Sequence, residues 1–201
     1  MKILLLGANG RTGRQLLSRA LDQGDMVTAL VRADDRLADV KHERLKVRVG
    51  SATDPEVLAA LVPGHDVVVS TLGPRRPTKA ASAIYDESAA AIIEAMQAAE
   101  VRRLIVTSSA LLFPEQTLSG RILRVLVSNI VGAATRMEDQ IRASNLDWTI
   151  ARTGFLNDDI ASIYQTSDRA GGTVSRAGVA NFLRTEMEQR GHVREVVGLS
   201  A

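Results

Sequence analysis

Three glycines near the N-terminus, Gly7, Gly10 and Gly13, stand three residues apart in the sequence GANGRTG. A short apolar run at 3–6 precedes them and apolar residues at helical spacing follow at 14–24, which predicts strand, glycine turn and helix. The N-terminus of a helix presents unpaired N–H groups and a partial positive charge that suit a phosphate, and glycine lets the backbone approach it closely. Because the spacing differs from the G-x-G-x-x-G of most dinucleotide-binding turns, a tight turn without a ligand is the alternative.

Few other residues have the types and spacing of a reactive centre. The chain of 201 residues has no cysteine, which excludes disulfides, thiolate metal sites and thiol catalysis. Its three histidines, His42, His65 and His192, lie far apart and form no H-x-H or H-x-x-x-H pair, so we expect no metal site. The glycine turn is therefore the strongest chemical signal in the chain.

The charge balance limits the choice of partner. Lysine and arginine together number 25 against 23 acidic residues, and the formal net charge of +2 does not indicate nucleic acid or an anionic membrane as a partner. The N-terminal apolar run of about four residues is too short for a signal peptide, and no stretch reaches membrane-spanning length. We therefore expect a cytoplasmic protein, a monomer or a dimer, that binds small molecules.

Predicted strands and helices alternate along the whole chain. The strands are expected at 3–6, 26–31, 45–49, 66–71, 103–107, 146–152 and 193–199, with a short strand at 173–175. The helices are expected at 14–24, 55–62, 83–100, 121–144 with a break near Gly132, and 178–190, and a basic loop is expected at 75–82. This alternation favours an α/β fold of the Rossmann type, a doubly wound, mostly parallel sheet with helices on both faces. No linker-like segment divides it, so residues 1–201 are expected to form one domain.

The ends of the predicted strands place polar residues together. In open α/β sheets the ligand lies beyond the carboxyl ends of the strands. The residues at those ends are small, polar or basic: Gly7, Arg32, Thr71, Leu72, Gly73, Thr107, Ser108, Ser109, Arg152, Thr153 and Gly154. This composition suits a crevice that holds a cofactor.

Several motifs together resemble a known family. GANGRTG after the first strand, STLG, the TSS after RLIV, WTIARTG and the C-terminal SRAGVANFL are similar to motifs of the atypical short-chain dehydrogenase/reductases, in particular the NmrA-like and biliverdin reductase B (flavin reductase) group. The resemblance covers essentially the whole chain. It implies NAD(P)H binding and a small substrate-side portion at about 153–201.

The resemblance also implies which residues hold the cofactor. They are Gly7, Asn9, Gly10, Arg11, Thr12, Gly13, Arg32, Ser51, Ala52, Thr71, Leu72, Gly73, Thr107, Ser108, Arg152, Thr153, Gly154 and Phe155. NAD-preferring sites carry an acid at the end of the second strand, where this chain has Arg32. Arg32 and Arg11 suit a 2′-phosphate, so NADP is expected rather than NAD, although either arginine could be a solvated surface charge.

Two positions depart from the family pattern. Ser51 stands where relatives usually have an acid beside the adenine, and the nearest acid is Asp54. Thr153 replaces the proline of an Arg-Pro-Gly loop that would face the nicotinamide.

The usual catalytic pair of the family is missing from the sequence. Neither tyrosine begins a Tyr-x-x-x-Lys motif, since Ala89 follows Tyr85 and Asp168 follows Tyr164 at that spacing. Ile130 and Ala134 stand where the resemblance places the pair, so carbonyl reduction by that mechanism is not expected.

Other residues are weaker catalytic candidates. Ser108 and Ser109 could bind substrate or nicotinamide, with capping of the strand-to-loop turn as the alternative. Glu138, where relatives can carry a histidine, is expected to be an exposed helix acid.

Hydride transfer to a flavin fits a site with few proton donors, because it chiefly requires two stacked rings. Leu111, Leu112, Phe113 and Phe155 are hypothesised to form the ring-binding wall. The predicted function is an NADPH-dependent oxidoreductase acting on a flavin such as FMN or FAD, a quinone or a similar small acceptor. The first alternative is an NADP(H)-binding sensor with a protein partner and no catalysis. The second is a relative of the nucleotide-sugar epimerases and dehydratases.

Overall fold

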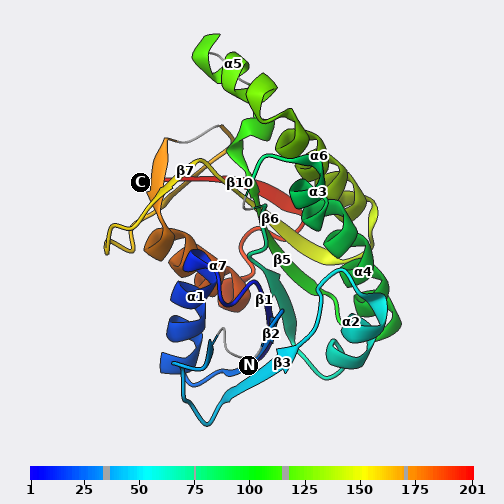
Figure 1. Ribbon diagram of the computed structural model, residues 1–201. Helices are drawn as coiled ribbons and strands as arrows, with labels where there is room; N and C mark the ends of the chain where they lie inside the picture. The colour runs from blue at the N-terminus through cyan, green and yellow to red at the C-terminus, as the bar shows by residue number, and fades with distance from the viewer. Residues whose placement is uncertain (34–36, 75, 115–117, 170–171) are drawn as a thin grey trace.

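The computed structural model describes residues 1–33, 37–74, 76–114, 118–169 and 172–201. Within them, one eight-stranded sheet has the order β3-β2-β1-β4-β5-β6-β10-β8 (Figure 1). Its strands are β1 (Lys2–Leu6), β2 (Met26–Val31), β3 (Leu45–Val49), β4 (Val67–Ser70), β5 (Arg103–Ser109), β6 (Asp147–Thr153), β8 (Gln165–Ser167) and β10 (Glu195–Ser200). All pairings are parallel except that of β8 with β10. This order confirms the predicted Rossmann-type, doubly wound sheet.

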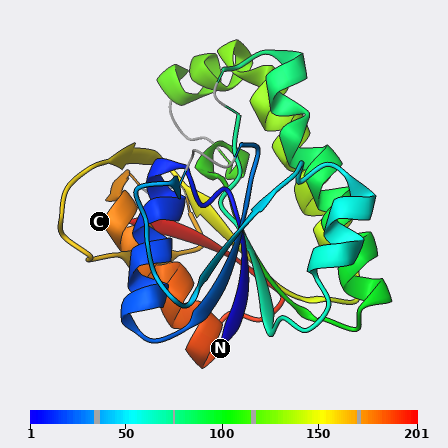
Figure 2. The ribbon, with the colours of Figure 1, turned by 60° about the horizontal axis from the view of Figure 1, so that its bottom comes forward.

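Helices cover both faces of the sheet. Figure 2 shows α1 (Arg11–Asp22) and α7 (Arg176–Gln189), in blue and orange, on one side. On the other side lie α2 (Pro55–Leu61), α4 (Ile84–Ala98) and α6 (Ser128–Ala143). Each face has its own apolar core, which explains why residues 3–6 of β1 are at most 1% exposed: alternate side chains enter opposite cores. The partly exposed β3 lies at the sheet edge, as its alternating sequence predicts.

Two predictions about local structure were wrong. The predicted basic loop at 75–82 contains a short helix, α3 (Lys79–Ser82), because the Thr78 hydroxyl accepts a hydrogen bond from Ala81 N and caps it; Arg75 lies outside the described residues. The predicted helix at 121–144 is divided at Val127 rather than at Gly132, into α5 (Leu118–Leu126) and α6, and Gly132 lies within α6.

The segment after β6 adds two short elements to the fold. β7 (Phe155–Asn157) and β9 (Thr173–Ser175) form a separate parallel pair. Ser175 then caps α7 by accepting a hydrogen bond from Gly178 N at 2.8 Å, so this helix begins at Arg176, earlier than predicted. No helix in the described part of the chain has the length and apolar character needed to cross a membrane.

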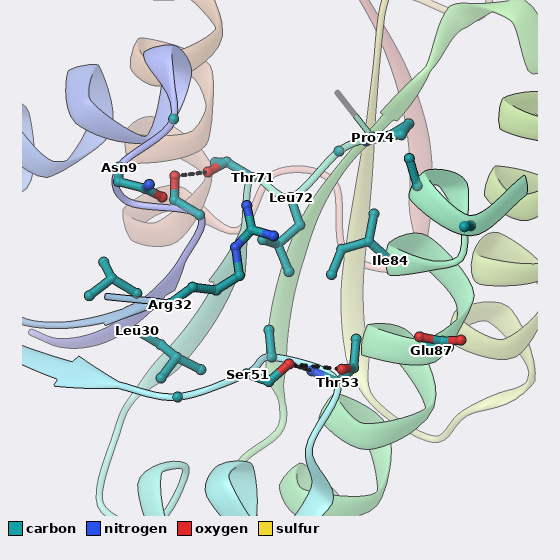
Figure 3. A pocket seen from close by; sticks show the side chains of 18 residues that line it. Asn9, Leu30, Arg32, Ser51, Thr53, Thr71, Leu72, Pro74, Ile84 and Glu87 are labelled. Atoms are coloured by element: carbon teal, nitrogen blue, oxygen red, sulfur yellow. Dashed lines mark hydrogen bonds between the residues drawn. The ribbon is translucent and has the colours of Figure 1, made fainter. Parts of the chain in front are cut away.

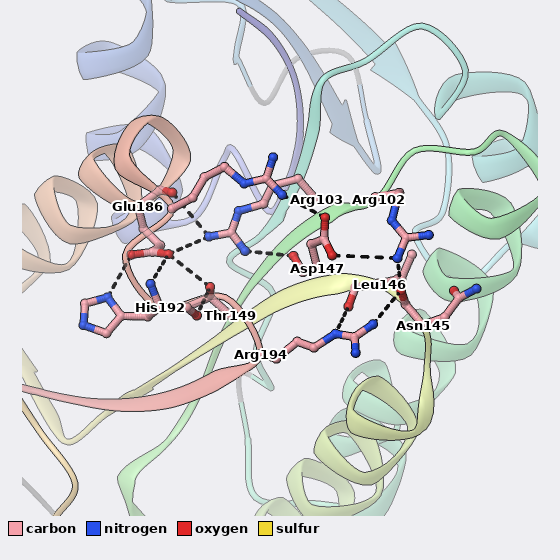
Figure 4. Close-up of polar contacts among 10 residues, drawn as sticks. Arg102, Arg103, Asn145, Leu146, Asp147, Thr149, Glu186, His192 and Arg194 are labelled. Atoms are coloured by element: carbon pink, nitrogen blue, oxygen red, sulfur yellow. Dashed lines mark hydrogen bonds and ion pairs between the residues drawn. The ribbon is translucent and has the colours of Figure 1, made fainter.

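A buried polar cluster ties α7 to the amino ends of β5 and β6 (Figure 4). Arg103 donates to the Glu186 carboxylate at 2.7 Å, and Thr149 and the His192 backbone N–H donate to the same oxygen. Burial lowers the pKa of the Arg103 guanidinium, and the paired carboxylate opposes that shift. This cluster lies at the end of the sheet opposite to the glycine turn.

Candidate functional site

The glycine turn connects β1 to α1 at the carboxyl edge of the sheet. Gly7 has φ of +83°, a conformation that other residues rarely adopt. A Cβ on Gly13 would overlap the Gly7 carbonyl oxygen, so the third glycine allows the helix to pack closely on the turn. The Thr71 hydroxyl donates to the Leu6 and Gly7 carbonyls at 3.2 and 3.3 Å, which fixes the turn against the end of β4. The result is a helix N-terminus that opens at the strand ends, with no acidic residue in its first turn.

Two adjoining hollows lie along this edge. The first, of about 430 Å³, runs from the glycine turn across the ends of β2 and β3 to α3 and α4 (Figure 3). The second, of about 290 Å³, lies over the ends of β5 and β6. Both are lined by Thr71, Leu72, Gly73 and Pro74, which follow β4. After the predicted position of the cofactor, we call them the adenosine-side hollow and the reaction-side hollow, and we call the two together the cleft.

Most of the predicted cofactor residues line this cleft. The adenosine-side hollow is lined by Gly7, Asn9, Gly10, Arg32, Ser51, Ala52, Thr71, Leu72 and Gly73. The reaction-side hollow is lined by Thr12, Thr71, Leu72, Gly73, Thr107, Ser108, Ser109, Thr153 and Gly154. Four predicted residues, Arg11, Gly13, Arg152 and Phe155, are in neither lining.

Some lining residues were not predicted. In the adenosine-side hollow they include Leu30, Thr53, Ala80, Ile84 and Glu87, and in the reaction-side hollow Tyr85, Ile130, Leu156 and Val179. Many of them belong to α3 and the start of α4. Residues 75–82 were predicted to form a loop, so no wall of the cleft was expected there.

Arg32 is a cation in the lining of the adenosine-side hollow. It follows β2 directly, is exposed, and reaches into the cleft between Asn9 and Leu72 (Figure 3). No acidic side chain pairs with it among the described residues. Its guanidinium is therefore available to an anion in the hollow.

Hydroxyl groups replace the expected adenine-side acid. The Ser51 and Thr53 hydroxyls lie 2.8 Å apart, and Thr53 N donates to the Ser51 hydroxyl. Asp54, the nearest acid, accepts from Glu56 N and Val57 N and caps α2. Its carboxylate is therefore used within the fold.

The prediction of an exposed Glu138 was wrong. This residue is 1% exposed and lies on the face of α6 that packs on β5 and β6. Its carboxylate accepts from Arg152 Nε at 2.9 Å and Nη2 at 2.6 Å, and from Arg142 at 2.6 Å. The Arg152 guanidinium also lies over the Phe113 ring, 4.6 Å from its centroid. Arg152 thus points to a buried partner rather than into the cleft.

The two candidate serines differ in their partners. Ser108 is buried and donates to Glu138 at 2.7 Å, so its hydroxyl is already engaged in the carboxylate network. The Ser109 hydroxyl accepts from Leu111 N at 3.3 Å and caps the 3₁₀ helix η2 (Ala110–Leu112), which matches the capping alternative.

The hypothesised ring-binding wall does not assemble along the cleft. Phe113 is buried beneath Arg152, and Phe155 is 69% exposed. Neither these two nor Leu111 and Leu112 are among the described residues that line the two hollows of the cleft. The apolar side chains that do line the reaction-side hollow are Ile130, Leu156 and Val179.

Arg11 has a partner in the segment that follows β7. Its guanidinium forms an ion pair with Asp158, which lies just after β7, and Arg176 at the start of α7 pairs with the same carboxylate at 2.8 Å. The side chains of Arg11 and Asp158 are 67% and 54% exposed. This pair links the glycine turn to the segment that follows β7.

Comparison with protein families gives one match over most of the chain. A family model described as NAD(P)H-binding matches residues 7–190. Among curated proteins, a protein named uncharacterized sugar epimerase YhfK from Bacillus subtilis is 27% identical over 202 residues, covering 94% of this chain and 89% of that protein. Photosystem II assembly factor Ycf39 from Guillardia theta is 30% identical over 151 residues, covering 74% of this chain but only 45% of the factor.

Solved structures share the fold at low sequence identity. The oxidoreductase ylbE from Lactococcus lactis has a TM-score of 0.86 at 21% identity, covering 100% of this chain and 90% of that one. A short-chain dehydrogenase/reductase from Veillonella parvula in complex with NADP has a TM-score of 0.83 at 23% identity, covering 100% and 94%. A candidate NADH-flavin reductase from Streptococcus pneumoniae has a TM-score of 0.79 at 22% identity, covering 99% and 98%.

Proposed function

The chain belongs to the NAD(P)H-binding family, and we propose that it is an NADPH-dependent oxidoreductase that reduces a flavin, quinone or similar planar acceptor. One observation carries this proposal: the glycine turn, Arg32 and the reaction-side hollow lie along a single cleft. A bound dinucleotide is long enough to contact all three of these features. The reductase named among the structural neighbours is consistent with this activity.

The residues of the cleft fit a dinucleotide phosphate. The close packing of Gly13 on Gly7 leaves the N-terminus of α1 open to a pyrophosphate, with Asn9 and Thr12 beside it. Arg32 would hold the 2′-phosphate, and Leu30 and Ala52 would contact the adenine. When bound, the cofactor supplies the hydride. The protein orients it, and the apolar side chains of the reaction-side hollow exclude water.

The choice of acceptor follows from what the reaction-side hollow lacks. Ser108 and Arg152 are engaged with Glu138, and Ser109 caps η2, so these three candidate groups are not free to transfer a proton. A flavin or quinone needs only a stacked ring, and its protons can come from water. A sugar epimerase, as the name of one relative suggests, would need a positioned acid and base.

A non-catalytic NADP(H) sensor is the second candidate. The same shortage of free polar groups favours it, and one relative is named as an assembly factor rather than an enzyme. In that case the cleft would bind the nucleotide and a surface of the protein would signal its presence to a partner.

Turnover separates these candidates. We expect purified protein to oxidise NADPH in the presence of FMN or menadione, followed as loss of the nicotinamide absorbance band. Without acceptor, or without protein, the loss should be much slower. Tight NADPH binding with no oxidation across several flavins and quinones would contradict the reductase proposal and favour the sensor.

Asp158 competes with the cofactor for Arg11 if this arginine binds a phosphate as predicted. An exposed ion pair contributes at most about 1 kcal/mol, so the Asp158→Asn variant should bind NADPH about two- to fivefold more tightly. Titration by nicotinamide fluorescence measures this. Asp168→Asn, which removes another exposed carboxylate, is the control and should leave the affinity unchanged. If Asp158→Asn bound NADPH equally or more weakly than the wild type, Arg11 would not be a phosphate-binding residue.

A further inference from the structure

Tyr85, a buried residue, brings its hydroxyl to the wall of the reaction-side hollow. It stands in the first turn of α4, is 8% exposed, and its ring packs in the apolar core beneath α4 and α6. The hydroxyl forms no hydrogen bond with any described residue. The hydroxyl of a tyrosine whose ring is buried usually has a hydrogen-bond partner, and this hydroxyl can find one only on the side of the cleft.

The hydroxyl faces the place where both hollows meet. A Cβ added to Gly73 would lie 3.4 Å from it, and Gly73 lines both hollows. The absence of a side chain at residue 73 therefore leaves the hydroxyl open to the cleft. Ile130, which stands where the resemblance places the tyrosine of the usual pair, lines the same hollow from α6. A phenol thus reaches this hollow from a different helix.

Its surroundings keep this phenol protonated. Burial, together with the negative charge of Glu138 on α6, raises the pKa of Tyr85 to about 12. The cations near Glu138, Arg142 and Arg152, are paired with that carboxylate rather than with the phenol. At neutral pH the hydroxyl is therefore a hydrogen-bond donor, and it is too weak an acid to deliver a proton readily.

We propose that the Tyr85 hydroxyl binds the ligand of the reaction-side hollow by donating a hydrogen bond to a carbonyl oxygen. Two molecules of the proposed reaction carry such an oxygen: the flavin or quinone acceptor, and the carboxamide of the nicotinamide. The inference rests on the proposed function. It makes Tyr85 a binding residue, and the proton taken up by a reduced acceptor then comes from water.

The Tyr85→Phe variant tests this role, because it removes the hydroxyl and leaves the ring in the core. The dissociation constants of NADPH, and of FMN or menadione in the presence of NADP⁺, are measured by fluorescence quenching, which does not require turnover. We expect one of them to rise about three- to tenfold, the effect of losing one neutral hydrogen bond. A rise for FMN or menadione identifies the acceptor as the ligand, and a rise for NADPH identifies the carboxamide.

Tyr164→Phe is the matched control. Tyr164 is the other of the two tyrosines, packs edge-on against Phe182 with ring centroids 5.4 Å apart, and does not line the hollow. Unchanged constants for both ligands in Tyr85→Phe would overturn the proposal, whether or not the protein turns over. The proposal would also be overturned if the wild-type rate changed with pH between 6 and 9 and this dependence disappeared in Tyr85→Phe. Tyr85 would then be a proton donor. If no acceptor is reduced, only the proposed function fails, and the binding constants still decide the role of Tyr85.

Discussion

The Arg32→Ala variant is expected to bind NADPH about 10- to 100-fold more weakly than the wild type, while its affinity for NADH changes less than about twofold. Among the described residues, Arg32 is the only cation in the lining of the adenosine-side hollow, and it has no acidic partner there. A guanidinium that contacts a 2′-phosphate makes a charge-assisted hydrogen bond that NADH cannot accept. The affinity for NADPH should therefore fall, and the affinity for NADH should not.

The measurement is a pair of titrations, of NADPH and of NADH, by the change in nicotinamide fluorescence. Arg44→Ala is the control, because Arg44 is an exposed arginine just before β3, at the opposite end of the sheet. It removes the same charge and should leave both affinities unchanged. An Arg32→Ala variant that keeps its NADPH affinity would refute the assignment of NADP. Equal losses for both cofactors would place Arg32 against the adenine or the pyrophosphate instead.

The strand ends were predictable because their signal is local. Short continuous apolar runs such as Val67–Ser70 favour strands buried on both faces, and glycine or a hydroxyl residue marks where each run stops. The rule that ligands bind at the carboxyl ends then brings Gly7, Arg32 and Thr71 together without any knowledge of packing. The observed register places Leu6 beside Ser70, as that rule requires.

The interior of the site could not be predicted in the same way. Glu138 looked like a surface acid because its partners, Arg152 and Ser108, lie 14 and 30 residues away in the chain. Its neighbours Ala134, Met137 and Ile141 are all buried, and this pattern on α6 was the available signal. Tyr85 was considered only for the Tyr-x-x-x-Lys spacing. Its position at the cleft depends on α3 and on Gly73, neither of which the helical pattern specifies.

Replacing Glu138 by alanine is expected to destabilise the fold by about 3–5 kcal/mol, the cost of leaving a buried charge without its partner. The Arg152 side chain is 10% exposed and would lose both of its hydrogen bonds to the carboxylate. Arg142, 40% exposed, can turn to solvent instead. For a chain of 201 residues, each kcal/mol corresponds to about 2–4 °C in Tm, so the loss should be visible in thermal or urea unfolding.

A double variant separates the ion pair from the packing. Glu138→Met with Arg152→Met removes both charges and keeps apolar volume, so it should be much closer in stability to the wild type than Glu138→Ala. Asp139→Ala, which removes a 65% exposed acid on the next residue of α6, should change the free energy of unfolding by no more than about 0.5 kcal/mol. If Glu138→Ala were as stable as Asp139→Ala, the carboxylate would not be the anchor of Arg152. If the double variant were as unstable as the single one, the loss would come from packing rather than from an unpaired charge. The expected order, with the single variant least stable, follows from a buried carboxylate that holds the ends of β5 and β6 together beneath the reaction-side hollow.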